Sequence, residues 1–177
     1  ASKLRVTMHP HGTWGTVGAA VAIAWLARRD AAGMVETINV ASSLGLSTSR
    51  RTMLEGGTVR NSFAGFSNQI GLMVSDLVAA GFTGEADGLG TVYGSVIADD
   101  WRPDEMVAEL GSRWEIARNY FKRHACCRYN HGALDALHEI VAKEGGRLEP
   151  DAIARIDVAT YVWAAQLAGQ EPHNMLA

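Results

Sequence analysis

A stretch of small and apolar residues near the start of the chain constrains its fold most. Residues 13–29, TWGTVGAAVAIAWLARR, are rich in alanine and contain Gly15 and Gly18. Alanine favours helix, and small side chains let helices approach one another closely. The longest apolar run, residues 17–27, covers only about half of the roughly 20 residues that a membrane span needs. The stretch therefore predicts a buried central helix.

Further helices are expected in the first half of the chain. Residues 31–57 carry apolar side chains at helical spacing, and this pattern weakens around Gly45. Residues 62–80 show a clearer apolar face and are followed by a glycine, as is common where a helix ends. The glycine-rich residues 85–103 are typical of a loop, and a short amphipathic helix is expected over residues 106–110.

The sequence pattern changes in the second half of the chain. Residues 114–127 are dense in aromatic and branched side chains and favour a strand, whereas residues 130–146 form an amphipathic helical pattern. Residues 154–165 alternate loosely and indicate a second strand. The fold class predicted is mainly α: a helical-bundle portion, residues 1–112, is followed by the start of a small α+β domain, residues 113–177.

Composition excludes several classes of partner. The 177 residues carry a net charge of −3 and no block of like charges, so a broad attraction for nucleic acid or anionic membrane is not expected. Cys126 and Cys127 are adjacent and are the only cysteines, which does not suit a disulfide framework and favours a reducing, cytoplasmic compartment. Because the chain begins with Ala1 rather than Met, we expect it to be a fragment of a longer protein.

Two histidines, His9 and His11, immediately precede the predicted central helix. A zinc site needs three or four ligands, and neither an H-E-x-x-H nor a C-x-x-C pair accompanies these two. A histidine beside a helix start can serve as a general acid or base, because its ordinary pKa lies near neutrality. It can equally be a capping or solvent-facing residue, which is the interpretation that spacing alone favours.

Residues 56–61, GGTVRN, place Arg60 and Asn61 just before the helix predicted over residues 62–80. Glycines free the backbone here, and a helix N-terminus adds partial positive charge, so the pair could hold a carboxylate. The alternative is that Arg60 is an ordinary surface partner of an acidic side chain.

A second cluster lies in residues 120–131, YFKRHACCRYNH, where basic side chains surround the two thiols. Cys127 and His131 are four residues apart and would share one face of a helix. They could form a thiolate–imidazole pair, half of a zinc site or part of an anion pocket. Alternatively, one cysteine is packed and the basic residues are a solvated face. We interpret His138 as structural or solvent-facing.

Three stretches in this order resemble one protein family. They are HPHGTWGTVGAAVAIAWL, GGTVRNSFAGFSNQIGLMVSDLVAAGFTG and YFKRHACCRYNHGALDAL, and together they resemble the middle of the MmgE/PrpD family. This family includes 2-methylcitrate dehydratase, cis-aconitate decarboxylase and iminodisuccinate epimerase. The resemblance covers nearly the whole chain. It implies a central portion of a longer chain, with a large all-helical domain, residues 1–112, and part of a smaller α+β lid domain, residues 113–177, usually in a homodimer.

The resemblance also implies roles for individual residues. His9 falls on the family histidine that opens the H-P-x-x-x-x-G-x-x-G-A-A stretch, and Arg60 falls where several members have an active-site lysine. Cys127 stands where decarboxylase-like members have a catalytic histidine. The catalytic residues implied are His9, Lys122, Cys127 and His131. The substrate-binding residues implied are Arg60, Asn61 and Arg128, with no metal ligands.

The function implied is that of a cofactor-independent lyase, a hydro-lyase first, acting beside a carboxylate of a small di- or tricarboxylic acid. Its site would lie in a cleft between the helical and lid domains. One alternative is an isomerase or epimerase of the same family, and another is a truncated, inactive binding or assembly module. A third alternative, a metal-binding protein, would use His9, His11, Cys127 and His131. The expected setting is a cytoplasmic homodimer without nucleic-acid or membrane partners.

Overall fold

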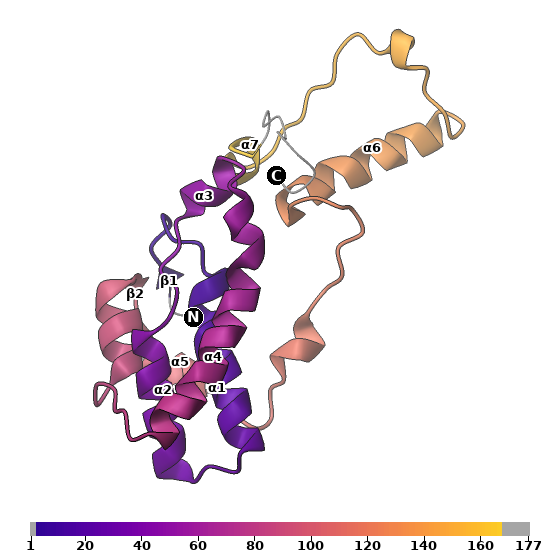
Figure 1. Cartoon of the computed structure of the whole chain (residues 1–177). Coiled ribbons are helices and arrows are strands. Elements are labelled where there is room, and N and C mark those ends of the chain that lie inside the picture. Colours follow the sequence, from indigo (N-terminus) through magenta and orange to yellow (C-terminus); the bar gives the residue numbers. More distant parts are fainter. Residues whose placement is uncertain (1–2, 168–177) are drawn as a thin grey trace. The chain divides into compact units, whose positions relative to one another are not determined.

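The computed structural model of the chain describes residues 3–167 and is mainly helical, with one small two-stranded sheet. The mainly α fold class predicted from the sequence is therefore confirmed. The described residues form two compact units, residues 3–112 and residues 113–167, and each is considered by itself (Figure 1). None of the described helices has the length and apolarity that crossing a bilayer requires.

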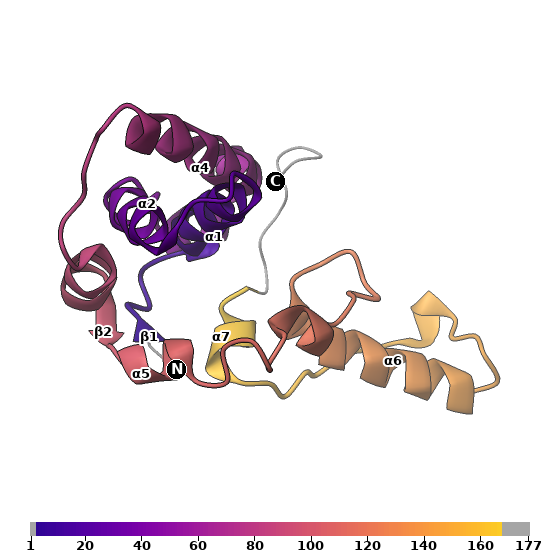
Figure 2. The same ribbon diagram turned by 90° about the horizontal axis from the view of Figure 1, so that it is seen from below.

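Three long helices form the body of the first unit and pack side by side in both views (Figures 1 and 2). They are α1 (His11–Leu26), α2 (Ala31–Ser43) and α4 (Phe63–Ala79). The central helix predicted near the start and the helix predicted over residues 62–80 are thus present. The Asp30 side chain caps α2 by accepting a hydrogen bond from the Gly33 N–H, at 2.8 Å.

The helix predicted over residues 31–57 is divided in the structure. α2 ends at Ser43, and the chain then runs through a short α3 (Arg50–Leu54) and a 3₁₀ turn, η1 (Thr58–Ser62), before α4 begins. Between α2 and α3, Ser49 forms an isolated antiparallel bridge with Met8. This backbone pairing holds the chain in an extended form where the helical periodicity weakens.

Helices α1 and α4 make the closest packing contact of the unit. A Cβ atom added at Gly71 would lie 2.6 Å from the Cβ atom of Ala19 and 2.9 Å from the backbone N of Ala20. One added at Gly15 would lie 2.6 Å from the Ser67 hydroxyl. Gly15 to Ser67 and Ala19 to Gly71 are both separated by 52 residues in the sequence, so α1 and α4 run parallel with their N-terminal ends together.

The hydrophobic core lies where the three long helices meet. It consists of the buried side chains of Ala20, Val40, Ala41 and Val74, packed against Val17, Leu44, Ile70, Leu77 and Val78. Two of its four buried members, Ala20 and Ala41, are alanines, so the helices can approach closely around a narrow core. This agrees with the small-residue pattern from which the central helix was predicted.

The glycine-rich residues 85–103, expected to form a loop, contain regular structure instead. A π-helical segment, η2 (Leu89–Val96), is followed by strand β2 (Ala98–Asp100), which pairs antiparallel with β1 (Lys3–Leu4). The fully buried Tyr93 donates a hydrogen bond from its hydroxyl to the Thr13 carbonyl oxygen, at 2.6 Å. This contact joins residues 80 positions apart, which a local sequence pattern does not show.

Helix α5 (Pro103–Val107) begins earlier than the helix predicted over residues 106–110. Proline is favoured in the first turn of a helix, where its missing N–H is not needed, and Pro103 marks this start. The unit closes at Gly111, whose φ of +86° is a left-handed conformation suited to glycine.

The second unit is built around α6 (His131–Lys143), which confirms the amphipathic helix predicted there. The other helical segments are short: η3 (Glu115–Arg118), η4 (Arg128–Asn130), η5 (Pro150–Ala152) and α7 (Val162–Ala165). Neither strand predicted in this half forms within residues 113–167. A strand requires a hydrogen-bonded partner, and residues 153–160 lie outside any helix or sheet.

The tight contact between α1 and α4 leads to a stability prediction. We expect Gly71→Ala to lower the free energy of unfolding by about 1–3 kcal/mol, because the new methyl group would press on the backbone of Ala20. Gly65→Ala is the matched control on the same helix, because no atom lies within 4 Å of its added Cβ. That change should be neutral or stabilise by up to about 1 kcal/mol. Urea unfolding of both variants tests this, and equal midpoints would contradict the contact.

Candidate active site

His9 is held at the N-terminal end of α1 by backbone pairing with the segment before α3. Its N–H donates to the Thr48 carbonyl oxygen at 2.8 Å, and the Thr48 hydroxyl donates to the His9 carbonyl oxygen at 2.7 Å. Pro10 follows as the N-cap residue of α1. The backbone of His9 has little freedom, because Thr48 forms two hydrogen bonds with it and the N-cap residue of α1 follows it directly.

The imidazole of His9 is buried, with 6% of the residue exposed. Its ring centroid lies 6.0 Å from that of Phe63, the first residue of α4, and 4.2 Å from that of His11. The buried Nδ1 atom has no hydrogen-bond partner within the described residues. A buried polar atom of this kind is uncommon, because its desolvation is not compensated, and at a candidate site it suggests an atom reserved for a ligand.

Electrostatics keep His9 neutral near physiological pH. Burial is the main cause that lowers the pKa of its imidazole, and the neighbouring His11 and Arg60 lower the pKa further. A neutral imidazole can accept a proton, as a general base must. Arg60 belongs to η1, far from His9 in the sequence, so the fold brings together two residues that the sequence assigned to one site.

The parallel alignment of α1 and α4 explains this meeting. Because the helices keep one register along their contact, the residues just before α1 lie beside those just before α4. Both helices therefore direct the partial positive charge of their N-terminal ends toward the same end of the bundle. Asn61 follows Arg60 and is exposed there. The arrangement suits a ligand with a carboxylate group.

The remaining predicted site residues belong to the second unit. His131 begins α6 and is 4% exposed, and its Nε2 atom has no hydrogen-bond partner in the described part of the chain. Cys127 is the N-cap residue of η4, so a 3₁₀ turn separates it from α6. No hydrogen bond joins Cys127 and His131 within residues 3–167. The His131 ring lies 5.0 Å from that of His124.

The two predicted cations of this unit are exposed. Arg128 places its guanidinium over the ring of Tyr120, with the Cζ atom 5.3 Å from the ring centroid, a cation–π geometry. Lys122 stands on the irregular segment before η4. Burial is the main cause that raises the pKa of Tyr161, Tyr129 and Cys127 raise it further, and Arg128 acts in the opposite direction.

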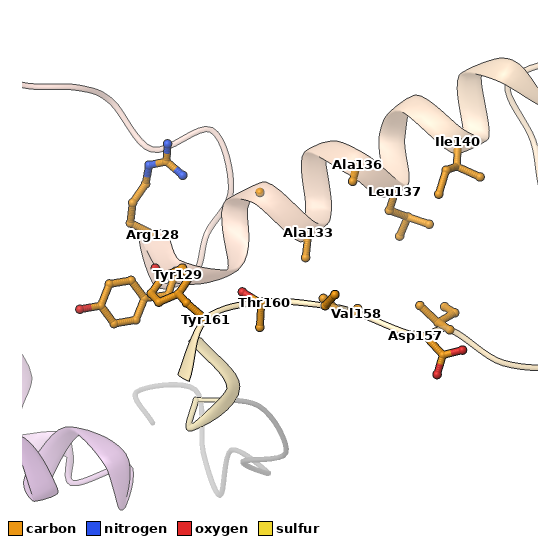
Figure 3. Close-up of a pocket in the computed structure, with 13 residues that line it drawn as sticks. Arg128, Tyr129, Ala133, Ala136, Leu137, Ile140, Asp157, Val158, Thr160 and Tyr161 are labelled. Atoms are coloured by element: carbon orange, nitrogen blue, oxygen red, sulfur yellow. The ribbon is translucent and has the colours of Figure 1, made fainter. Parts of the chain in front are cut away.

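A hollow of about 410 Å³ separates one face of α6 from the extended residues 156–161 (Figure 3). The helix contributes mainly apolar side chains to it, those of Ala133, Ala136, Leu137 and Ile140. Arg128 stands at one end of the hollow. Apolar walls with few polar groups do not by themselves select a polar acid, so we do not assign the substrate to this hollow.

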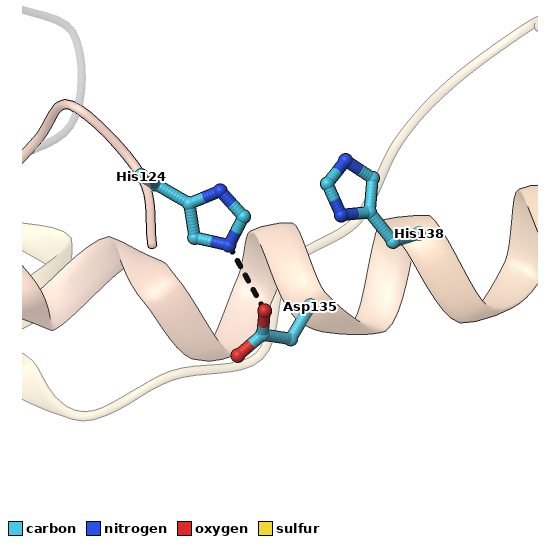
Figure 4. A group of neighbouring side chains, drawn as sticks. All are labelled: His124, Asp135 and His138. Atoms are coloured by element: carbon cyan, nitrogen blue, oxygen red, sulfur yellow. Dashed lines mark hydrogen bonds and ion pairs between the residues drawn. The ribbon is translucent and has the colours of Figure 1, made fainter. Parts of the chain in front are cut away.

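Sequence reasoning missed one group of side chains in the second unit. The Nε2 atom of His124 lies 2.9 Å from Oδ1 of Asp135, and His138 lies next to them (Figure 4). The hydrogen bond with His124 is the main cause that lowers the pKa of Asp135. His138 is exposed, in agreement with the interpretation from sequence. The D-x-x-H spacing within the predicted helix was the one local signal for this group.

Comparison with known families agrees with the resemblance noted from the sequence. A family model described as the MmgE/PrpD N-terminal domain matches residues 1–97, more than half of the chain. The chain therefore belongs to the MmgE/PrpD family, whose members are generally enzymes. Searches of curated proteins and of solved structures gave no significant match.

The lowered pKa of His9 predicts a pH dependence of stability. Below the ordinary histidine value of 6.5, the unfolded chain binds a proton at His9 before the folded protein does, so acidification favours unfolding. Between about pH 7 and pH 5, the wild type should lose more stability than His9→Gln does. Urea unfolding across this range tests the prediction. Lys143→Gln, an exposed change at the end of α6, serves as the control and should follow the wild type. Identical slopes for all three proteins would contradict the prediction.

Proposed function

We propose that the protein is a cofactor-independent lyase that eliminates water from a small di- or tricarboxylic acid. The proposal rests on family membership and on one observation: His9 is buried, its Nδ1 atom has no hydrogen-bond partner among residues 3–167, and burial, His11 and Arg60 together lower its pKa. A base beside a cation, at two helix N-termini, is what proton removal next to a carboxylate requires.

In the proposed reaction, His9 removes a proton from the carbon next to a substrate carboxylate. The electrons of the broken C–H bond move toward that carboxylate and create an enediolate-like charge, which Arg60 stabilises as it develops. Loss of hydroxide from the neighbouring carbon, with a proton added to form water, completes the double bond. The proton acquired by His9 then returns to solvent, and no external oxidant or reductant is needed.

Several family members have a lysine at the position of Arg60. A lysine could both stabilise charge and transfer a proton, whereas an arginine can do only the first. A guanidinium keeps its proton at any physiological pH and can hold a carboxylate through two hydrogen bonds. Arg60 is therefore assigned to charge stabilisation rather than proton transfer, with Asn61 as a second substrate-binding residue. Proton donation to the leaving group is left to the other predicted residues, Lys122, Cys127 and His131.

Several finer points of this proposal come from the family resemblance alone. They are a site in a cleft between the helical and lid domains, a substrate-binding role for Arg128, and a homodimer. Decarboxylation would begin at the same carboxylate-bearing carbon, and an epimerase would return the proton to the opposite face after the same first step. The products of the reaction distinguish these chemistries.

The first test is turnover of 2-methylcitrate, citrate, cis-aconitate and iminodisuccinate by the purified protein, with product analysis. A dehydrated product supports the hydro-lyase, whereas an inverted or decarboxylated product would replace it with the corresponding alternative. His9→Ala and Lys122→Ala should each lower kcat/KM by about 10²-fold or more, because each removes a proton-transfer group. Normal turnover in both variants would overturn the site, and no turnover of any acid by the wild type would favour a binding module.

A second test isolates Arg60. We expect Arg60→Gln to lower kcat/KM by about 10²-fold, because the developing negative charge loses its stabilising cation. The acid limb of the pH profile of kcat/KM should also move to higher pH, because the guanidinium no longer lowers the pKa of His9. Arg51→Gln is the matched control, since Arg51 is exposed on the neighbouring α3 and pairs with Glu55. A loss of activity in Arg60→Gln with an unmoved acid limb would refute the coupling of Arg60 to His9.

A further inference from the structure

The second unit gathers three side chains that suit a metal ion. One ligand atom from each of His124, Asp135 and His138 lies within 4.8 Å of the other two (Figure 4). Asp135 and His138 stand three residues apart on α6, which places them on one face of the helix. His124 comes from the irregular segment before η4. The group therefore ties this segment to the middle of α6.

We propose that these three side chains form a binding site for a divalent transition-metal ion, Zn²⁺ above all. Two imidazole nitrogens and one carboxylate oxygen are a ligand set that proteins use for Zn²⁺ and for other borderline metal ions. Three protein ligands leave a coordination position open for water or a small ligand. The inference does not depend on the proposed lyase activity, whose residues are different.

The distances within the group are close to those that a metal ion requires. Two ligands of tetrahedral zinc lie about 3.3 Å apart, because each stands about 2.0–2.1 Å from the metal. Nε2 of His124 and Oδ1 of Asp135 are 2.9 Å apart, so a separation of a few tenths of an ångström would admit the ion between them. His138 can complete the set by a side-chain rotation, since it is exposed and its ring faces the other two residues in Figure 4.

The charges around the group also permit a cation. Asp135 contributes an acidic side chain whose Oδ1 atom faces Nε2 of His124 at 2.9 Å. The three side chains border a second hollow beside α6, whose lining also includes Arg123 and Glu139, two side chains of opposite charge. The side chain of His124 is only 15% exposed, which limits its motion, whereas the exposed His138 leaves a path for the ion to enter.

The site has a structural consequence for its neighbour His131. The His124 ring lies 5.0 Å from the buried His131 ring and 5.4 Å from the ring of His138. Ligation of His124 would fix the orientation of its ring and thereby one wall of the His131 environment. The metal is thus inferred to order the segment that leads into α6.

The experiment is titration of the purified, tag-free protein with Zn²⁺, followed by calorimetry, and with Co²⁺, followed by its visible absorption. We expect one Zn²⁺ per chain and a Co²⁺ spectrum typical of four or five ligands. His124→Gln, Asp135→Asn and His138→Gln should each weaken binding at least about tenfold. Thermal unfolding with and without Zn²⁺ should show a larger increase in Tm for the wild type than for these three variants.

Two controls separate this site from other donors. Glu144→Gln changes an exposed carboxylate just beyond α6 and should bind Zn²⁺ as the wild type does. The double variant Cys126→Ser/Cys127→Ser removes both thiols and should also retain binding. Absence of stoichiometric Zn²⁺ binding in the wild type would overturn the proposal. Wild-type affinity in the double variant His124→Gln/His138→Gln, or loss of binding in the cysteine variant, would do so as well.

Discussion

The contact between α1 and α4 at Gly71 governs the arrangement of the first unit. Ala19 and Ala20 fit against Gly71 because a glycine leaves room for the backbone of the other helix. This close approach aligns the two helices in parallel, and their common register brings the residues before α1 beside those before α4. The meeting of His9 with Phe63 and Arg60 follows from a packing contact several turns away.

The candidate active site in this unit carries a cost in stability. The Nδ1 atom of the buried His9 has no hydrogen-bond partner in the described part of the chain, so its desolvation is not compensated there. The Thr48 pairing and the packed start of α1 hold His9 there nevertheless. Buried polar atoms without a hydrogen bond lower the stability of a protein, yet they are frequent at functional sites. There, a bound ligand supplies the missing hydrogen bond and thereby gains binding energy.

The second unit uses the opposite faces of one helix for different chemistry. The apolar face of α6, which includes Leu137 and Ile140, borders the hollow beside residues 156–161. The polar face presents Asp135 and His138 to His124. Helical periodicity alone separates these two surfaces, since residues three or four positions apart share a face. Packing and a candidate metal site therefore coexist on a helix of 13 residues.

The sequence by itself determined the helices that depend on local pattern: the alanine-rich α1, the periodic α4 and the amphipathic α6. It also indicated His9 and Arg60 as site residues, through family resemblance as much as through chemistry. It was wrong about the strands after Trp114 and about the loop that contains Tyr93, because a strand depends on a partner and the π-helical segment depends on the distant Thr13 carbonyl. Tertiary structure alone decided the contacts between residues far apart in the chain, which include His9 with Arg60 and His124 with Asp135. Periodicity reports only which face of an element is apolar, whereas the register between two elements depends on how closely their side chains allow them to approach.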